Sequence, residues 1–310
     1  MDSPIRSASA SRHGTRTAPT VVAPRDPLAV LGCLTPRDRQ LLSLIGEQQV
    51  LTTSQITRLA FPSRTMAQRR LLRLYQLGVL DRFRWHQIVG SQDWHYTLGL
   101  LGGALLAAAR ATTPPSPAEQ RRRVTRLAAS PRLMHLLGIN DFFTGLAAHA
   151  RSHPGATLDL WWSERRCAEH YGQLVRPDGY GRWTEHGQDV EFFLEYDTGS
   201  EPLTRVTSKL PGYADLATAG GPNIPVLIWL PSARREANLR AALSTHPAPV
   251  TVATANTELA RALCCGPADP VWLVDSSQHR RPLIHLGTPA GVGHDRPTVA
   301  NTGPPVADVW

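Results

Sequence analysis

The chain has 310 residues, with 33 Lys+Arg against 25 Asp+Glu and a formal net charge of +8, and its pI is near 9.9. This length fits two domains, each able to bury its own core. The 4 cysteines include no CxxC pair, so they indicate neither a disulfide framework nor a zinc ribbon. The longest apolar run, Leu98 to Ala109, is too short to span a bilayer, and the N-terminus lacks the apolar stretch of a secretory signal. We expect a reduced, cytoplasmic, soluble protein.

The positive charge is concentrated in the first part of the chain. Residues 1–130 contain 18 arginines against 7 acids, whereas residues 131–310 contain 15 basic against 18 acidic side chains. This asymmetry predicts that the first part contacts a polyanion, for which nucleic acid is the usual choice. A coding bias towards arginine is the alternative, although it would spread evenly along the chain. Lys209 is the one lysine, which indicates either chance or a position that needs a compact ammonium.

The first elements follow a tail without periodicity. Residues 1–33 are rich in Ser, Ala, Pro, Thr and Arg, and we expect a disordered basic tail. A helix then begins after Thr35, a good N-cap, with Pro36 at the first helical position and Asp38 near the positive end of the helix dipole. A second begins after Thr52 with a Thr-x-x-Gln capping box.

A third helix, from Pro62-Ser63 to Leu77, is amphipathic, and Gly78 follows its end. Its buried arc is expected to consist of Ala67, Leu71, Leu74 and Tyr75. Its opposite arc consists of Thr65, Arg69, Arg73 and Gln76. Two extended stretches follow, at 79–85 and 94–98, joined by a loop that contains Gly90-Ser91.

Three helices followed by a two-stranded hairpin are typical of a winged helix, here over residues 34–111. In that fold the third helix enters the major groove, and arginines on the wing meet phosphates. The residues expected to contact DNA are Arg64, Thr65, Arg69, Arg70, Arg73, Gln76, Arg82 and Arg84. Each arginine taken singly is better explained as part of a solvated face, and a winged helix can also bind proteins.

The rest of the chain predicts a linker, an α/β domain and a second tail. The linker covers 112–130, where Arg121, Arg122, Arg123 and Arg126 either extend the basic surface or solvate a linker helix. A long helix begins at Ser130-Pro131. Strands are then expected at 158–162, 173–177, 190–196, 225–230, 250–253 and 271–274, and helices at about 202–218, 233–243 and 256–264. This alternation predicts an α/β sheet over 131–284, followed by a flexible C-terminal tail over 285–310.

Three acids are expected at the ends of the central strands. Asp178 leaves a strand at a turn, and Glu195 and Asp197 lie two apart, so they point to the same face of theirs. Such carboxylates suit Mg²⁺ or Mn²⁺, with Asp178 and Glu195 as ligands. The metal could activate water and neutralise charge on a phosphodiester, and Lys209 on the next helix could reach the scissile phosphate.

The order helix, three strands, helix, strand, with Pro177-Asp178 and Glu195 on neighbouring strands, resembles the core of PD-(D/E)xK nucleases. The chain over roughly 34–275, with Arg176-Pro177-Asp178-Gly179, Glu195-Tyr196-Asp197 and Lys209-Leu210-Pro211-Gly212-Tyr213, is similar to the replication-relaxation family of actinobacterial plasmids and conjugative elements. The resemblance implies an α+β chain, a winged helix followed by a nuclease-like domain. Such nucleases carry lysine where Asp197 stands, so Lys209 is a candidate for a migrated lysine. Glu164 is a weaker candidate ligand.

Three functions remain open from the sequence. The first is a DNA-binding protein of a plasmid or integrative element, acting in replication, relaxation or conjugative transfer, whose nuclease-like domain does not cut and needs no cofactor. The second is an active Mg²⁺- or Mn²⁺-dependent endonuclease that uses Asp178, Glu195, Asp197 and Lys209. The third is a protein-interaction scaffold. The expected partners are double-stranded DNA and replication or transfer proteins, with no membrane. His135 is expected to be a packing histidine rather than a ligand.

Overall fold

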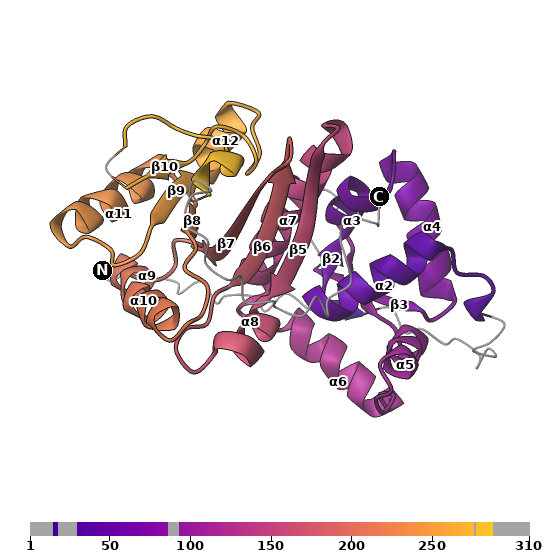
Figure 1. Ribbon diagram of the computed structural model, residues 1–310. Helices are drawn as coiled ribbons and strands as arrows, with labels where there is room; N and C mark the ends of the chain where they lie inside the picture. Colours follow the sequence, from indigo (N-terminus) through magenta and orange to yellow (C-terminus); the bar gives the residue numbers. More distant parts are fainter. Residues whose placement is uncertain (1–14, 18–29, 86–92, 276, 288–310) are drawn as a thin grey trace, which may run out of the picture.

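The computed structural model describes residues 15–17, 30–85, 93–275 and 277–287. Figure 1 shows a mixed α/β molecule in which the N-terminal helices gather at one end and a large sheet with its covering helices forms the other. This agrees with the α+β class expected from the sequence.

The N-terminal elements begin at the positions that their capping residues predict. They are α2 (Pro36–Gln48), β2 (Leu51–Thr52), α3 (Thr53–Ala60), α4 (Arg64–Gln76), β3 (Leu80–Trp85) and β4 (His95–Leu98). Thr35 and Thr52 each form a complete capping box, with Asp38 and Gln55. Ser63 caps α4, and Gly78 has the positive φ of 73° typical of the residue that ends a helix.

The first sheet has the strand order β1-β3-β4-β2. Strand β1 (Thr15–Thr17) pairs antiparallel with β3, so these residues differ from the disordered tail expected over 1–33. Val30 is also buried in the core, ahead of the expected domain start at residue 34. The expected loop residues Gly90 and Ser91 lie outside the described residues.

Two helices occupy the region after the hairpin. Helix α5 (Leu100–Ala109) arises from the Gly-rich apolar run. Helix α6 (Pro117–Ala128) lies inside the expected linker, because Ser116 and Glu119 form a further capping box and Pro117 opens the helix. Within the expected linker, the segment without helix that joins α5 to α6 is therefore 112–116.

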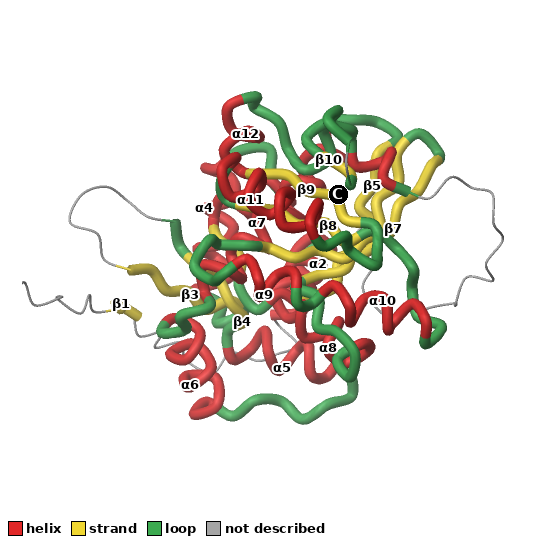
Figure 2. Tube along the Cα trace, turned by 90° about the vertical axis from the view of Figure 1, so that its left-hand side faces the viewer, coloured by secondary structure: helices red, strands yellow, loops and turns green. Residues whose placement is uncertain are grey.

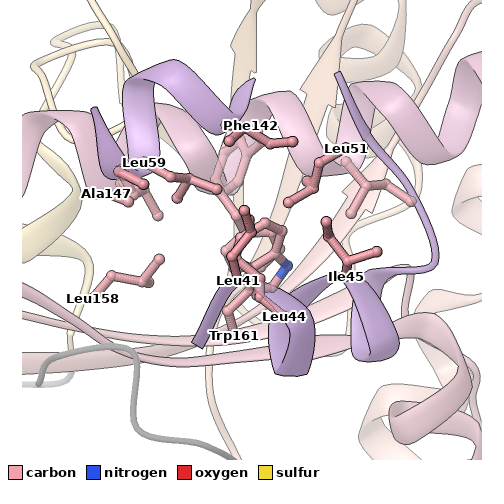
Figure 3. Packing of buried hydrophobic residues seen from close by; sticks show 14 of the residues in the cluster. Leu41, Leu44, Ile45, Leu51, Leu59, Phe142, Ala147, Leu158 and Trp161 are labelled. Atoms are coloured by element: carbon pink, nitrogen blue, oxygen red, sulfur yellow. The ribbon is translucent and has the colours of Figure 1, made fainter. Parts of the chain in front are cut away.

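The front half and the second sheet share one hydrophobic core. Leu41, Ile45 and Leu59 of the N-terminal helices belong to the same buried cluster as Phe142 and Trp161, and Figure 3 shows these side chains packed together. The sequence predicted separate cores on either side of the segment 112–130. In the structure, burial of apolar surface holds the two parts against each other.

The second sheet has six strands in the order β10-β9-β8-β7-β6-β5. They are β5 (Ala156–Ser163), β6 (Gly179–Glu185), β7 (Gln188–Tyr196), β8 (Val226–Leu230), β9 (Val252–Asn256) and β10 (Leu273–Val274). β5, β6 and β7 form an antiparallel meander, whereas β8 and β9 continue it in parallel with β7. Figure 2 shows these strands, in yellow, between the covering helices.

Helices cover both faces of this sheet. α7 (Leu133–Ser152) packs on one face, through the cluster that includes Phe142 and Phe143. The other face is covered by α10 (Leu210–Thr218), whose Leu210 and Tyr213 pack with Phe193 of β7. The remaining helices are α8 (Glu164–Tyr171), α9 (Leu203–Thr207), α11 (Ala233–Thr245), α12 (Thr257–Ala262) and the 3-10 helix η1 (Leu283–Leu286).

Three expectations in this half are corrected. The apolar run 173–177 is not a strand but a loop between α8 and β6, so Asp178 precedes its strand rather than following one. The expected helix over 202–218 is divided into α9 and α10, because Pro211 lies in the first turn of a new helix. The tail expected over 285–310 does not include Leu286, which is buried within η1.

Within the described residues, none of the helices combines the length and apolar character needed to cross a membrane.

Candidate functional site

Helix α4 presents a polar, basic face to solvent. Its buried side chains are Ala67, Leu71, Leu74 and Tyr75, and its exposed ones include Thr65, Arg69, Arg73 and Gln76, as its amphipathic pattern predicts. Among the residues that the structure describes, no ion pair or hydrogen bond engages the Arg69 or Arg73 side chain. These two guanidinium groups are therefore available to an external anion.

Two arginines of the expected DNA-binding set are instead held by the protein. Arg70 pairs with the buried carboxylate of Asp38 and donates to Cys33 O at 2.9 Å. Arg64 donates to Ser54 Oγ at 2.8 Å and pairs with Asp93. These contacts join α4 to its neighbours, because a guanidinium can serve several acceptors at once.

The hairpin arginines stack on an aromatic ring. Arg82 lies 4.0 Å and Arg84 4.3 Å from the ring centroid of Trp94, and Arg82 also lies 4.3 Å from that of Tyr75 on α4. Stacking orients a guanidinium while leaving its N–H edge free to donate. Both arginines lie on the same face of β3 as α4.

A second group of candidate side chains lines a cavity of about 400 Å³ where β6 begins and β7 ends, within the larger sheet. Asp178, Glu195 and Lys209 meet there, although they come from the start of β6, the end of β7 and the N-cap of α10. Lys209 Nζ pairs with Glu195 Oε2 and lies 3.9 Å from Asp178 Oδ1. The lone lysine is thus brought to the two acids that the sequence singled out.

The sheet pairing fixes the position of the two acids. The backbone N–H of Asp178 donates to Leu194 O at 3.0 Å, and Asp178 Oδ2 accepts from the Tyr196 backbone N–H at 2.9 Å. Glu195 lies on the face of β7 that packs on α10, where Tyr213 donates to its Oε1. The alternation of side chains along β7 therefore directs Glu195 into the cavity, as expected.

The protein shifts the pKa values of Glu195 and Asp178 in opposite directions. Burial and the neighbouring charge of Asp178 raise the pKa of Glu195 to about 7, against the smaller opposing effects of Lys209 and Tyr213. Burial also disfavours the charged form of Asp178, but His135, Lys209 and the Tyr196 N–H together lower its pKa. The two acids therefore differ in charge over part of the acidic range.

His135 packs as expected from the sequence, and its imidazole also lies beside Asp178 in this cavity. Its Nε2 lies 3.2 Å from Asp178 Oδ1, and its ring meets the Tyr196 ring edge-on at 5.9 Å. Burial alone would lower the pKa of His135, but the Asp178 carboxylate raises it. No local motif signals this contact, because α7 reaches Asp178 only through the tertiary fold.

Asp197 and Glu164 have partners of their own. Asp197 is buried and forms a bidentate pair with Arg235 of α11, and its Oδ1 also accepts from the Gly199 N–H at 3.0 Å. Glu164 accepts two hydrogen bonds of 3.0 Å from Arg132. Both line the cavity, but their negative charges are already compensated by arginines.

The carboxylates of Asp178 and Glu195 are engaged by groups of the protein itself. Asp178 Oδ2 and both Glu195 oxygens accept hydrogen bonds, from the Tyr196 N–H, Lys209 and Tyr213. Asp178 Oδ1 lies 3.2 Å from His135 Nε2 and 3.9 Å from Lys209 Nζ. The described residues contain no group of three or more His, Cys, Asp or Glu side chains arranged to hold a metal ion. A cation between the two acids would have to displace the Lys209 ammonium, which already supplies the positive charge there.

Comparison with known families gives one match. A model of the family described as replication-relaxation matches residues 42–226, more than half of the chain. The match includes α4, Asp178, Glu195 and Lys209, and it ends before Arg235. No curated protein and no solved structure matches.

Proposed function

The chain belongs to the replication-relaxation family, and we propose that it acts in replication, relaxation or transfer of a plasmid or integrative element by binding duplex DNA through α4. The second sheet then serves as a nuclease-like domain that does not cut.

The observation that carries the proposal is the exposed face of α4. Arg69 and Arg73 lie on it with no ion pair in the described chain, and Thr65 and Gln76 add hydrogen-bonding groups. The order α2, β2, α3, α4, β3, β4 supports the expected winged helix, a fold in which the third helix enters the major groove. Arg84, which stacks on Trp94 of the same hairpin, would contact phosphates if the hairpin acts as a wing.

Equilibrium binding to a fluorescent duplex at low salt tests this proposal. The Arg69→Ala/Arg73→Ala variant is expected to bind at least about tenfold more weakly, since two guanidinium groups no longer reach phosphates or bases. Arg234→Ala/Arg261→Ala, which removes the same charge from exposed positions on α11 and α12, is the matched control. Equal affinity in the two variants would contradict the proposal. Absence of binding by the wild type would favour a protein-interaction scaffold instead.

The satisfied carboxylates support a domain that does not cut. Lys209 compensates the charge of Glu195 directly, and Arg235 compensates that of Asp197. A cleavage site needs groups that are left available for the substrate and its cation.

Metal-dependent cleavage remains a second candidate because Asp178, Glu195 and Lys209 converge on one cavity, the three residue types that the nuclease resemblance requires. Incubation of supercoiled plasmid with Mg²⁺ or Mn²⁺ separates the two candidates. No nicking is expected. Nicking that disappears in Asp178→Ala, Glu195→Ala and Lys209→Arg would establish the endonuclease.

A further inference from the structure

Helices α4 and α6 lie on opposite faces of the β3–β4 hairpin. Alternate β3 residues point to opposite sides. Arg82 contacts Tyr75 of α4, whereas Phe83 is buried with Val124 and Leu127 of α6. Figure 1 likewise shows α6 and α4 well separated at this end of the molecule. We therefore expect a straight duplex on α4 not to reach the exposed arginines of α6.

The side of α6 that faces α5 borders a basic groove. The groove has a volume of about 860 Å³ and is lined by α5, α6 and the segment between them. Its cationic side chains are Arg110, Arg122, Arg123, Arg126 and Arg165, of which Arg165 is already paired with two glutamates. The acid among its lining residues is Glu119, whose carboxylate already accepts from the Ser116 backbone N–H at 2.7 Å.

The groove-lining arginines of α6 form no salt bridge within the described residues, although the pKa of Glu119, lowered by hydrogen bonds from Ser116, is lowered further by the charge of nearby Arg122. In the described ranges, no ion pair or hydrogen bond engages the side chain of Arg122, Arg123 or Arg126. Arg122 and Arg126 are four apart on one helix, a spacing at which like charges destabilise the helix. Desolvation and the nearby positive charge of Arg165 lower the pKa of Arg123. Uncompensated positive charge gathered along one groove is the arrangement that binds an external polyanion.

We propose that the α6 groove binds the phosphate backbone of a second DNA duplex segment, separate from the segment on α4. The guanidinium groups of Arg122, Arg123 and Arg126 would contact phosphates, for which their planar, multi-donor geometry is suited. The choice of DNA over another polyanion rests on the proposed function. Two duplex-binding surfaces on opposite faces of one hairpin would let a single chain hold two DNA segments together.

The first test measures duplex affinity at low salt for the full chain. Arg122→Ala/Arg123→Ala/Arg126→Ala is expected to lower affinity at least about fivefold and to reduce the slope of log K against log salt by roughly two to three. Alanine preserves helix propensity. The control is Arg234→Ala/Arg261→Ala/Arg281→Ala, which removes equal charge from elsewhere on the surface.

The outcomes separate this inference from the proposed function. If the α6 variant binds like the control while Arg69→Ala/Arg73→Ala is impaired, the inference is overturned and the α4 proposal stands, which leaves an acidic protein as the occupant of the groove. If the α6 variant is impaired while Arg69→Ala/Arg73→Ala is not, the inference stands and the α4 proposal fails.

The second test asks whether two segments are bound at once. An immobilised duplex saturated with wild-type protein is expected to capture a second, labelled duplex, and the α6 variant is expected to capture at least about tenfold less at equal protein loading. Capture that persists in the α6 variant would indicate bridging by a dimer through α4 and would overturn the inference. Failure of the wild type to capture would overturn it as well, since both surfaces would then contact one duplex.

Discussion

Lys209 donates a hydrogen bond to the buried carboxylate of Glu195, from the N-cap of α10 to the end of β7. The side chain of Glu195 is 5% exposed and that of Lys209 is 34% exposed. If the pair were broken, water could still solvate the ammonium of Lys209, whereas the carboxylate of Glu195 would remain buried. The chain contains no other lysine. The one lysine of the chain therefore places its compact ammonium beside two carboxylates, those of Glu195 and Asp178.

Replacement of this lysine should destabilise the protein in a pH-dependent way. Lys209→Met is expected to lower the free energy of unfolding by about 1–3 kcal/mol at pH 8, because Glu195 is left charged and unpaired. The loss should shrink at pH 5, where Glu195 is protonated. Urea unfolding at both pH values measures it. Arg205→Met, which removes an exposed cation one turn earlier, should be nearly neutral, and an equal loss at both pH values would contradict the account.

Glu195 should weaken the fold as the pH rises. Its pKa in the folded protein is raised to about 7 from an ordinary 4.5, so the native state binds the proton more tightly than the unfolded chain does. Stability contributed by the protonated acid is present below pH 4.5 and is lost as the pH rises to 7. The stability of wild type relative to Glu195→Gln should therefore fall across this interval. For Glu201→Gln, at an exposed position, the difference in unfolding free energy from wild type should not change with pH over this interval.

The Asp38–Arg70 pair should show the opposite dependence. Burial would raise the pKa of Asp38, but hydrogen bonds from Arg70 and Thr35 lower it overall. Its stabilising effect is therefore present above the ordinary value of 3.8 and is lost as the pH falls through the lower native pKa. Asp38→Asn should lower stability by about 1–3 kcal/mol at pH 7. The difference in melting temperature from wild type should narrow towards pH 3. Exposed Asp215→Asn should have little effect at either pH.

Gly138 allows α7 to approach Tyr196 closely. A Cβ at this position would lie 2.3 Å from two atoms of the Tyr196 ring, so Gly138→Ala should displace the tyrosine whose backbone N–H holds Asp178. We expect a loss of about 1–3 kcal/mol in urea unfolding, despite the better helix propensity of alanine. At Gly145 on the same helix the nearest atom, of Pro267, lies 3.1 Å away, so Gly145→Ala should cost less. Equal effects of the two substitutions would argue against the close approach of helix and ring.

Local patterns predicted the parts of the fold that local chemistry determines. The helices after Thr35, Thr52 and Ser63 begin where the capping residues are, because an N-cap satisfies the first amide groups of a helix wherever the helix lies in the fold. The alternation along β7 likewise placed Glu195 correctly. The same rules misassigned 173–177, since a short apolar run does not distinguish a strand from a loop that packs its side chains on a core.

Long-range contacts were not visible in the sequence. His135 joins Asp178, and Arg235 joins Asp197, only because the sheet and its covering helices bring distant segments together. Arg70 is similarly indistinguishable from Arg69 and Arg73 until Asp38 of α2 is placed beside it. Patterns of residue type located the site, but they did not show which charges the protein itself compensates.

The salt dependence of duplex binding tests the central claim most directly. For wild-type protein, log K should fall linearly with log salt concentration, and Arg69→Ala/Arg73→Ala should reduce the slope by roughly one for each phosphate that the variant no longer neutralises. Arg234→Ala/Arg261→Ala should leave the slope unchanged. An identical slope in wild type and Arg69→Ala/Arg73→Ala would contradict the assignment of α4 as the DNA-binding helix.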